Sequence, residues 1–199
     1  MNDKEPATTT AAESEKLLRE AGALLEGHFQ LASGKHSSQY VEKFRLLEQP
    51  VQTEALCLMI ADWSRRVSPQ VVTSPTTGGI IISYEVARIL GTRSIFAEKE
   101  EGHPGRSFQR GFRIDPGERV LVVDDVLTTG GSIREVIDAV NRLGGEVVGV
   151  AVLVDRAGGR TDFGVLPKKD FFACLALDIP AYEVSECPLC RDGVPLKVT

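Results

Sequence analysis

The chain has 199 residues, of which 42% are hydrophobic and 26% are charged, and its formal net charge is −5. This composition is typical of a soluble globular protein, and the length predicts one domain with a substantial core. The negative charge argues against bulk nucleic-acid binding, and no apolar run approaches the roughly 20 residues of a membrane span. Because a signal pattern is also missing and the 4 cysteines form no even framework, we expect a cytoplasmic protein.

The N-terminal part of the chain is expected to form a helix, a strand pair and a second helix. Residues 1–11 are predicted to be a disordered start. Apolar residues at helical spacing predict a helix over residues 13–25. The stretch Leu24–Tyr40 is predicted to form two short strands around a Ser-Gly turn. The second helix, over residues 51–67, has these apolar residues at helical spacing: Val51, Ala55, Leu58, Met59 and Trp63.

Strands and helices then alternate, which is typical of a parallel sheet. Strands are predicted at residues 70–75, 93–97, 120–123, 146–155 and 171–177. Helices are predicted after the first strand, up to Leu90, and after the third, over residues 133–140. We therefore expect an α/β fold, with a mostly parallel central sheet of about five strands, helices on both faces and a small N-terminal hood. The single domain would comprise a hood (12–45), a core (46–180) and a C-terminal tail (181–199).

The most informative stretch is residues 119–132, Arg-Val-Leu-Val-Val-Asp-Asp-Val-Leu-Thr-Thr-Gly-Gly-Ser. An apolar strand leads to Asp124 and Asp125, and a small polar loop then opens a helix. Open α/β sheets bind ligands at this edge, and loop N–H groups at a helix start suit a phosphate monoester. The two acids suit the hydroxyls of a polyol, although acids also occur at plain solvated strand ends. Neither the Gly-x4-Gly-Lys-Ser/Thr nor the Gly-x-Gly-x-x-Gly nucleotide motif is present.

Three further features lie near the expected edge of the sheet. The loop 76–80, Thr-Thr-Gly-Gly-Ile, offers a second anion site after a strand. The loop 98–111 is long, charged and rich in Gly and Pro, so it is either a mobile lid or a surface hairpin. Its residues 100–110 are too polar for us to expect inward packing. Arg156 follows a buried strand, where it could neutralise a neighbouring acid or bind a planar anionic ligand.

Two motifs resemble a known family. Residues 119–132 resemble the phosphoribosyl-diphosphate signature of type I phosphoribosyltransferases, hydrophobics followed by Asp/Glu-Asp-x-x-Thr-Thr/Ala-Gly. Residues 27–40 match Gly-x-Phe-x-Leu-x-Ser-Gly-x-x-Ser-x-x-Tyr, which is similar to the hood of orotate phosphoribosyltransferases. The resemblance covers most of the chain. It implies a glycosyltransferase that moves the 5-phosphoribosyl group from 5-phosphoribosyl 1-diphosphate to orotate in pyrimidine biosynthesis, giving orotidine 5′-monophosphate and diphosphate.

Two alternatives stay open beside that activity. A purine phosphoribosyltransferase would share the signature, although the Ser-Gly-x-x-Ser hood speaks against it. A non-catalytic regulator that senses the sugar diphosphate would need a helix-turn-helix or a basic face.

The resemblance also implies roles for individual residues. Lys99, Asp124 and Asp125 are the candidate catalytic residues. Phosphoribosyl diphosphate would contact Lys99, Asp124, Asp125, Val126, Leu127, Thr128, Thr129, Gly130, Gly131 and Ser132. Orotate would contact Thr128 and Arg156, and the cations His103, Arg106 and Arg110 would neutralise the diphosphate. Mg²⁺ would bridge ligand oxygens with few protein ligands, and the family forms homodimers in which each loop closes over the neighbour's ligand.

Several positions depart from the family pattern or stay unassigned. Many members carry a basic residue where Ala32 and Gly78 stand, and Arg where Glu98 stands. Cys187 and Cys190 form one Cys-x-x-Cys, with no second pair or His pair nearby in the sequence. We expect a tight surface turn there, with a zinc shared between subunits or a redox pair as alternatives.

Overall fold

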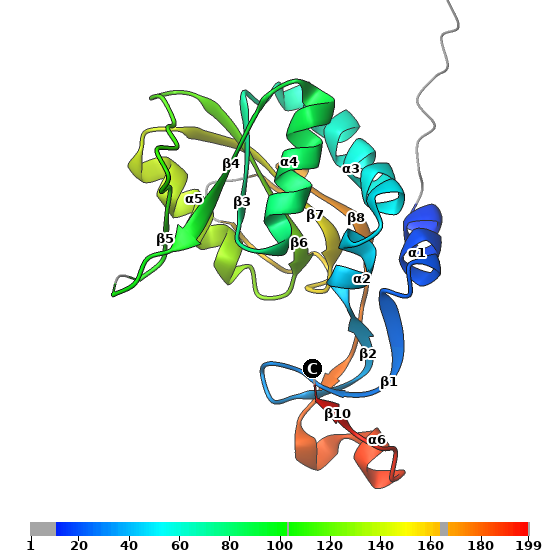
Figure 1. Cartoon of the computed structure of the whole chain (residues 1–199). Coiled ribbons are helices and arrows are strands. Elements are labelled where there is room, and N and C mark those ends of the chain that lie inside the picture. The colour runs from blue at the N-terminus through cyan, green and yellow to red at the C-terminus, as the bar shows by residue number, and fades with distance from the viewer. Residues whose placement is uncertain (1–10, 103, 164–166, 199) are drawn as a thin grey trace, which may run out of the picture.

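The computed structural model describes residues 11–102, 104–163 and 167–198, which form two β-sheets and the helices around them (Figure 1). The larger sheet has six strands in the order β5-β4-β3-β6-β7-β8. Their bounds are β3 (Val71–Pro75), β4 (Arg93–Lys99), β5 (Arg106–Ser107), β6 (Arg119–Leu127), β7 (Glu146–Asp155) and β8 (Phe171–Ala176). All neighbours from β4 to β8 are parallel, and only the two-residue β5 is antiparallel. The predicted α/β fold is confirmed, with β5 as an addition at one edge.

Helices cover both faces of this sheet. The helices are α1 (Ala11–Glu20), α2 (Lys43–Leu47), α3 (Pro50–Ser64), α4 (Gly78–Leu90), α5 (Gly131–Arg142) and α6 (Pro188–Arg191), with 3-10 turns at Arg65–Val67, Lys168–Asp170 and Val184–Glu186. Leu121 and Val123 of β6 join the core cluster that contains residues of α1, α3 and α4, whereas Val120 and Val122 join the cluster that contains α5. Because successive strand residues point to opposite faces, this four-residue run is buried on both sides, as its composition predicts.

The hood is a second, four-stranded sheet in which two strands from residues 24–41 pair with two strands from residues 181–198 (Figure 1). Its order is β10-β1-β2-β9, with bounds β1 (Leu24–Gln30), β2 (His36–Val41), β9 (Ala181–Tyr182) and β10 (Lys197–Val198). Gln30 is in register with Val198, and His36 with Tyr182. The segments that we divided into a hood and a tail therefore form one sheet.

Two predicted elements differ in detail from the structure. The first helix ends at Glu20 rather than residue 25, because Gly22 adopts a left-handed conformation with φ +65° that stops it, and β1 begins at Leu24. The central strand continues through Leu127, so the acid pair lies within β6 rather than beyond it. The predicted start at residues 1–11 falls outside the described part of the chain except for its last residue, which begins α1.

The buried side of α3 is not the stripe that we expected. Val51 and Leu58 are 76% and 43% exposed, whereas Leu56, Cys57 and Ile60 are completely buried. Apolar residues occur on most sides of α3, so their spacing alone does not identify the side that faces the sheet. Among the described residues, no helix combines the length and the apolar character that crossing a membrane would require.

Candidate active site

A tight loop joins β6 to α5 and forms a small hollow of about 50 Å³. Gly130 has φ +78°, and a Cβ at this position would lie only 2.7 Å from Cγ2 of Thr161, so glycine is required. Arg134 of α5 holds the loop from behind, because its Nη1 donates to the carbonyl oxygen of Thr129 at 2.8 Å. The hollow is lined by Asp124, Val126, Leu127, Thr128, Thr129, Gly130, Gly131, Ser132 and Ile133. The predicted phosphate loop is therefore a preformed hollow at the start of a 12-residue helix.

The acid pair is buried beside this hollow. Asp124 and Asp125 are only 8% and 4% exposed, and the backbone N–H of Asp125 donates to Oδ1 of Asp124 at 2.9 Å. Nζ of Lys43 lies 2.7 Å from Oδ2 of Asp125, which neutralises one carboxylate. Burial, and then the negative charge of Asp125, raise the pKa of Asp124 to about 7. Without a ligand, Lys43 therefore neutralises the negative charge of Asp125. Below neutral pH, Asp124 holds a proton and is uncharged.

Lys43 is a site residue that sequence reasoning missed. It is the first residue of α2, which follows the hood strands directly. Nothing in the motifs connects it to Asp125, because the contact joins segments about 80 residues apart.

The loop between β3 and α4 packs against the same acids. A Cβ on Gly78 would lie 2.1 Å from Oδ2 of Asp125, so any side chain here would displace that carboxylate. This contact gives a steric reason for glycine where many family members carry a basic residue. The peptide bond between Thr76 and Thr77 is cis. Oγ1 of Thr76 accepts a hydrogen bond from Nη1 of Arg106 at 3.0 Å.

A larger cavity of about 670 Å³ opens between the hood and the sheet edge. Its lining consists of Leu31, Ala32, Ser33, Tyr40, Val41, Lys43, Asp125, Val126, Thr128, Thr129, Arg156, Ile179 and Ala181. Burial lowers the pKa of Arg156, and its buried Nε has no hydrogen-bond partner among the described residues. Within the described chain, Arg156 forms no ion pair with an acid. Of the two roles that its position allowed, the structure therefore does not support neutralisation of a neighbouring acid. An unpaired guanidinium on a cavity wall suits an anionic ligand.

The loop cations are less uniform than the sequence suggests. Lys99 is exposed at the end of β4, and Arg110 forms two 2.8 Å contacts with the carboxylate of Glu98. Arg106 is only 5% exposed and lies 3.1 Å from a carboxylate oxygen of Glu135 on α5. The expectation that residues 100–110 are too polar to pack inward is therefore wrong at Arg106, because Glu135 balances its charge and Nη1 donates to the carbonyl oxygen of Ala97. His103 lies outside the described residues.

Comparison with known proteins identifies the family. A family model described as the phosphoribosyl transferase domain matches residues 52–167. The orotate phosphoribosyltransferase of Desulforamulus reducens is 48% identical over 179 residues, which cover 90% of this chain and 91% of that protein. The chain belongs to the orotate phosphoribosyltransferases.

Two further members of this family agree. The orotate phosphoribosyltransferase of Thermotoga maritima is 46% identical over 180 residues, covering 90% of this chain and 93% of that protein. The crystal structure of the orotate phosphoribosyltransferase from Aeropyrum pernix has a TM-score of 0.67 at 29% identity, covering 81% of this chain and 92% of that one. The family assignment that the two motifs suggested is confirmed, and the purine alternative gains no support from these relatives.

Proposed function

We propose that this protein transfers the 5-phosphoribosyl group from 5-phosphoribosyl 1-diphosphate to orotate, giving orotidine 5′-monophosphate and diphosphate. This is a step in the biosynthesis of pyrimidine nucleotides. The observation that carries the proposal is the 670 Å³ cavity, because it brings together Asp125 of the acid pair, the first residues of the phosphate-sized loop and an unpaired arginine. The names of relatives that match 90% of the chain support the same activity. None of the four cysteines forms a disulfide, which suits a reducing compartment, and we extend the proposal to the cytoplasm.

Different residues of the site bind different parts of the phosphoribosyl diphosphate. The N–H groups of Thr128–Ser132 bind the 5′-phosphate, where the positive end of the α5 dipole favours an anion. Asp124 and Asp125 accept hydrogen bonds from the ribose hydroxyls. In the reaction the C1–O bond to diphosphate breaks while a bond forms between C1 and a ring nitrogen of orotate, and the proton lost by that nitrogen is taken up by the departing diphosphate. Positive charge develops on the ribose, and the buried carboxylates beneath it stabilise that charge.

Arg156 and Thr128 hold orotate against the hood. A guanidinium presents a planar pair of donors that matches a carboxylate, and orotate carries one. The lowered pKa of Arg156 reflects its burial, and an anionic ligand would compensate the charge. Tyr40 and Ala181 line the same cavity on the hood side.

The acid pair also fits a requirement for Mg²⁺. Burial, and then the charge of Asp125, raise the pKa of Asp124, and a divalent cation near the acid pair would offset the repulsion between the two carboxylates. When bound, Mg²⁺ supplies charge neutralisation of the leaving diphosphate. Lys99 would add a second positive charge from the loop.

We further propose a homodimer with shared sites. Val51, Ile81 and Tyr84 form an exposed apolar surface on α3 and α4, the α3–α4 face, with exposed fractions of 76%, 43% and 66%. They line a hollow of about 520 Å³. An apolar surface of this kind suits a second copy of the chain. Because α4 begins at Gly78 beside Asp125, a partner on this face would lie next to the site.

A substrate panel tests the proposed activity. The purified protein is incubated with 5-phosphoribosyl 1-diphosphate, Mg²⁺ and one of orotate, adenine, hypoxanthine or uracil. We expect diphosphate release and nucleotide formation with orotate alone. Equal turnover of hypoxanthine, or no turnover of orotate, would sink the proposal.

A further inference from the structure

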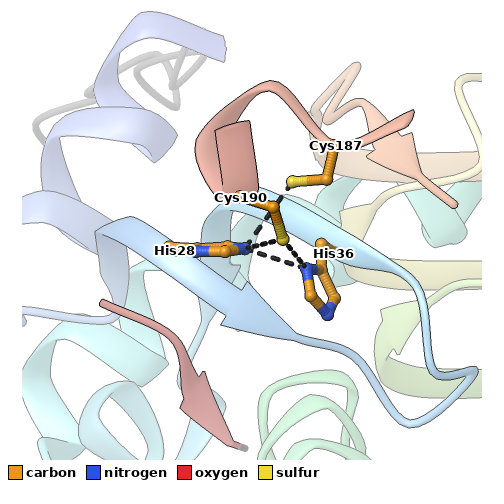
Figure 2. Close-up of side chains that lie close together, drawn as sticks. All are labelled: His28, His36, Cys187 and Cys190. Carbon is orange, nitrogen blue, oxygen red and sulfur yellow. Dashed lines mark hydrogen bonds between the residues drawn. The ribbon is translucent and has the colours of Figure 1, made fainter. Parts of the chain in front are cut away.

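Two histidines of the hood and the two tail cysteines come together in space, in a group that we call the Cys–His cluster (Figure 2). His28 belongs to β1 and His36 to β2, whereas Cys187 precedes α6 and Cys190 lies within it. All four potential ligand atoms lie within 4.8 Å of one another. His28, His36 and Cys187 are 2%, 3% and 0% exposed, and Cys190 is exposed. The expected tight turn is present, but Cys187 is buried rather than at the surface, and a His pair lies beside it.

We propose that the Cys–His cluster is a structural zinc site whose four ligands all come from one chain. Zinc bonds of about 2.0–2.1 Å to nitrogen and 2.3 Å to sulfur, arranged tetrahedrally, put two nitrogens about 3.3 Å apart and nitrogen and sulfur about 3.5 Å apart. Here Nε2 of His28 and Nδ1 of His36 are 2.9 Å apart. The nitrogen–sulfur separations are 3.2 Å from His36 to Cys190, 3.6 Å from Cys187 to His28 and 3.7 Å from Cys190 to His28. These four separations are close to those of a coordination shell around one ion, and the other two are at most 4.8 Å.

The tautomer of His28 is fixed for metal binding. Its Nδ1 lies 2.8 Å from the carbonyl oxygen of Val194, which can only accept a hydrogen bond. Nδ1 therefore carries the proton, and the lone pair of Nε2 faces the other three residues. Metal-binding histidines commonly use their second nitrogen in this way, and the carbonyl orients the ring.

The short turn that carries the cysteines is also ordered by its backbone. The N–H of Arg191 donates to the carbonyl of Cys187 at 3.3 Å, and the N–H of Gly193 donates to that of Cys190 at 3.2 Å. Gly193 has φ +65°, which ends the turn. Both thiols are therefore placed toward the hood by local hydrogen bonds.

The tail needs such a link because little else holds it. β9 and β10 have two residues each, and α6 has no buried residue. Val184, Leu196 and Val198 are 56%, 43% and 80% exposed, so the tail has little apolar core of its own. In small segments of this kind metal binding supplies the folding free energy. Four protein ligands leave no open position, so the ion is structural rather than catalytic.

The proposed ion would join the two pieces that wall the large cavity. Ser33 and Tyr40 come from the β1–β2 hairpin, and Ile179 and Ala181 from the segment leading into the tail. Zinc therefore sets the distance between these walls without touching the ligand.

Metal content tests the site directly. The whole chain is purified without chelators under reducing conditions, and zinc per chain is measured by plasma mass spectrometry. We expect about one zinc per chain and its loss in Cys187→Ser and Cys190→Ser. Matched controls are Cys57→Ser and Cys174→Ser, buried cysteines outside the cluster, which should keep the full zinc content.

Two measurements on the unaltered chain keep the proposal testable if a cysteine variant fails to fold. Protein grown with Co²⁺ in place of Zn²⁺ should show the visible bands of tetrahedral Co²⁺ and a thiolate charge-transfer band. Treatment with 1,10-phenanthroline should speed proteolysis within residues 181–198 and leave the core intact. A chain that binds neither metal, or half an equivalent shared between two chains, would overturn the proposal. A mass two daltons low, which reveals a Cys187–Cys190 disulfide as the resting state, would overturn it too.

Discussion

Replacing Asp124 by Asn should stabilise the ligand-free protein above about pH 5 while damaging its activity. Burial and the charge of Asp125 raise the pKa of Asp124 from 3.8 to about 7. A raised pKa means that the folded protein holds this proton more tightly than the unfolded chain. The resulting stability is fully present below about pH 4 and is lost as the pH rises to about 7. Asn cannot titrate, so the variant avoids this loss.

The magnitude follows from the width of that window. Each pH unit between the two pKa values costs about 1.4 kcal/mol, so the stability difference between variant and unaltered protein should grow by on the order of 3 kcal/mol from pH 5 to pH 8. Urea unfolding of both proteins at the two pH values, in buffer without Mg²⁺, measures it. Turnover of orotate should fall at least about tenfold, since a charged hydrogen-bond acceptor is lost. A stability difference that does not change with pH would refute the reasoning.

The remaining predictions concern the ligands and the assembly. Arg156→Ala should lower kcat/KM for orotate roughly ten- to hundredfold, because a charge-assisted contact of about 1.5–3 kcal/mol is lost. The same change at its exposed neighbour, Arg160→Ala, should leave kcat/KM unchanged, and equal effects of the two changes would contradict a contact between Arg156 and orotate. Gly78→Ala should cost about 1–3 kcal/mol of stability and most of the turnover, because its Cβ would displace the Asp125 carboxylate; a crystal structure with that carboxylate unmoved would count against this. Withdrawing Mg²⁺ should stop diphosphate release, and adding it back should restore the rate; activity that persists in metal-free buffer would disprove the requirement. Asp125→Asn and Lys99→Ala, each inactive alone, should regain about a quarter of normal activity when unfolded and refolded together with Zn²⁺, because each mixed dimer has one intact site. A dead mixture, with subunit exchange verified by mass, would exclude a loop that acts across the interface.

The core of the fold could be predicted because each sequence pattern there is compatible with only one secondary structure. The run Val120–Val123 must be buried on both faces, and the Gly and Thr residues after it can only form a loop before α5. The 3.6-residue pattern failed at α3, where exposed Val51 and buried Leu56 are equally apolar, so only the packed structure identifies the inner side. The end of the first helix was also misplaced. The apolar pattern continues past Gly22 into β1, whereas the helix ends at Glu20.

The candidate site was predicted where its residues are close in sequence and missed where they are not. Asp124, Asp125 and the phosphate loop belong to one stretch, which its motif identified. Lys43 reaches Asp125 from α2, and Glu135 draws Arg106 inward from α5, and neither contact leaves a local pattern. The two tail cysteines looked unpartnered for the same reason, because the residues beside them lie at the other end of the chain.

The hood sheet can be completed only late in the synthesis of the chain. β1 is complete at Gln30, but its partner strand β10 ends at Val198, about 170 residues later. At roughly 5–20 residues per second, the ribosome needs about 10–30 s to supply that strand, and the core sheet has its last strand, β8, before then. The edge of β1 that pairs with β10 therefore stays unpaired on the nascent chain until β10 is made. Products truncated before β10 would carry the phosphate loop with an incomplete hood sheet.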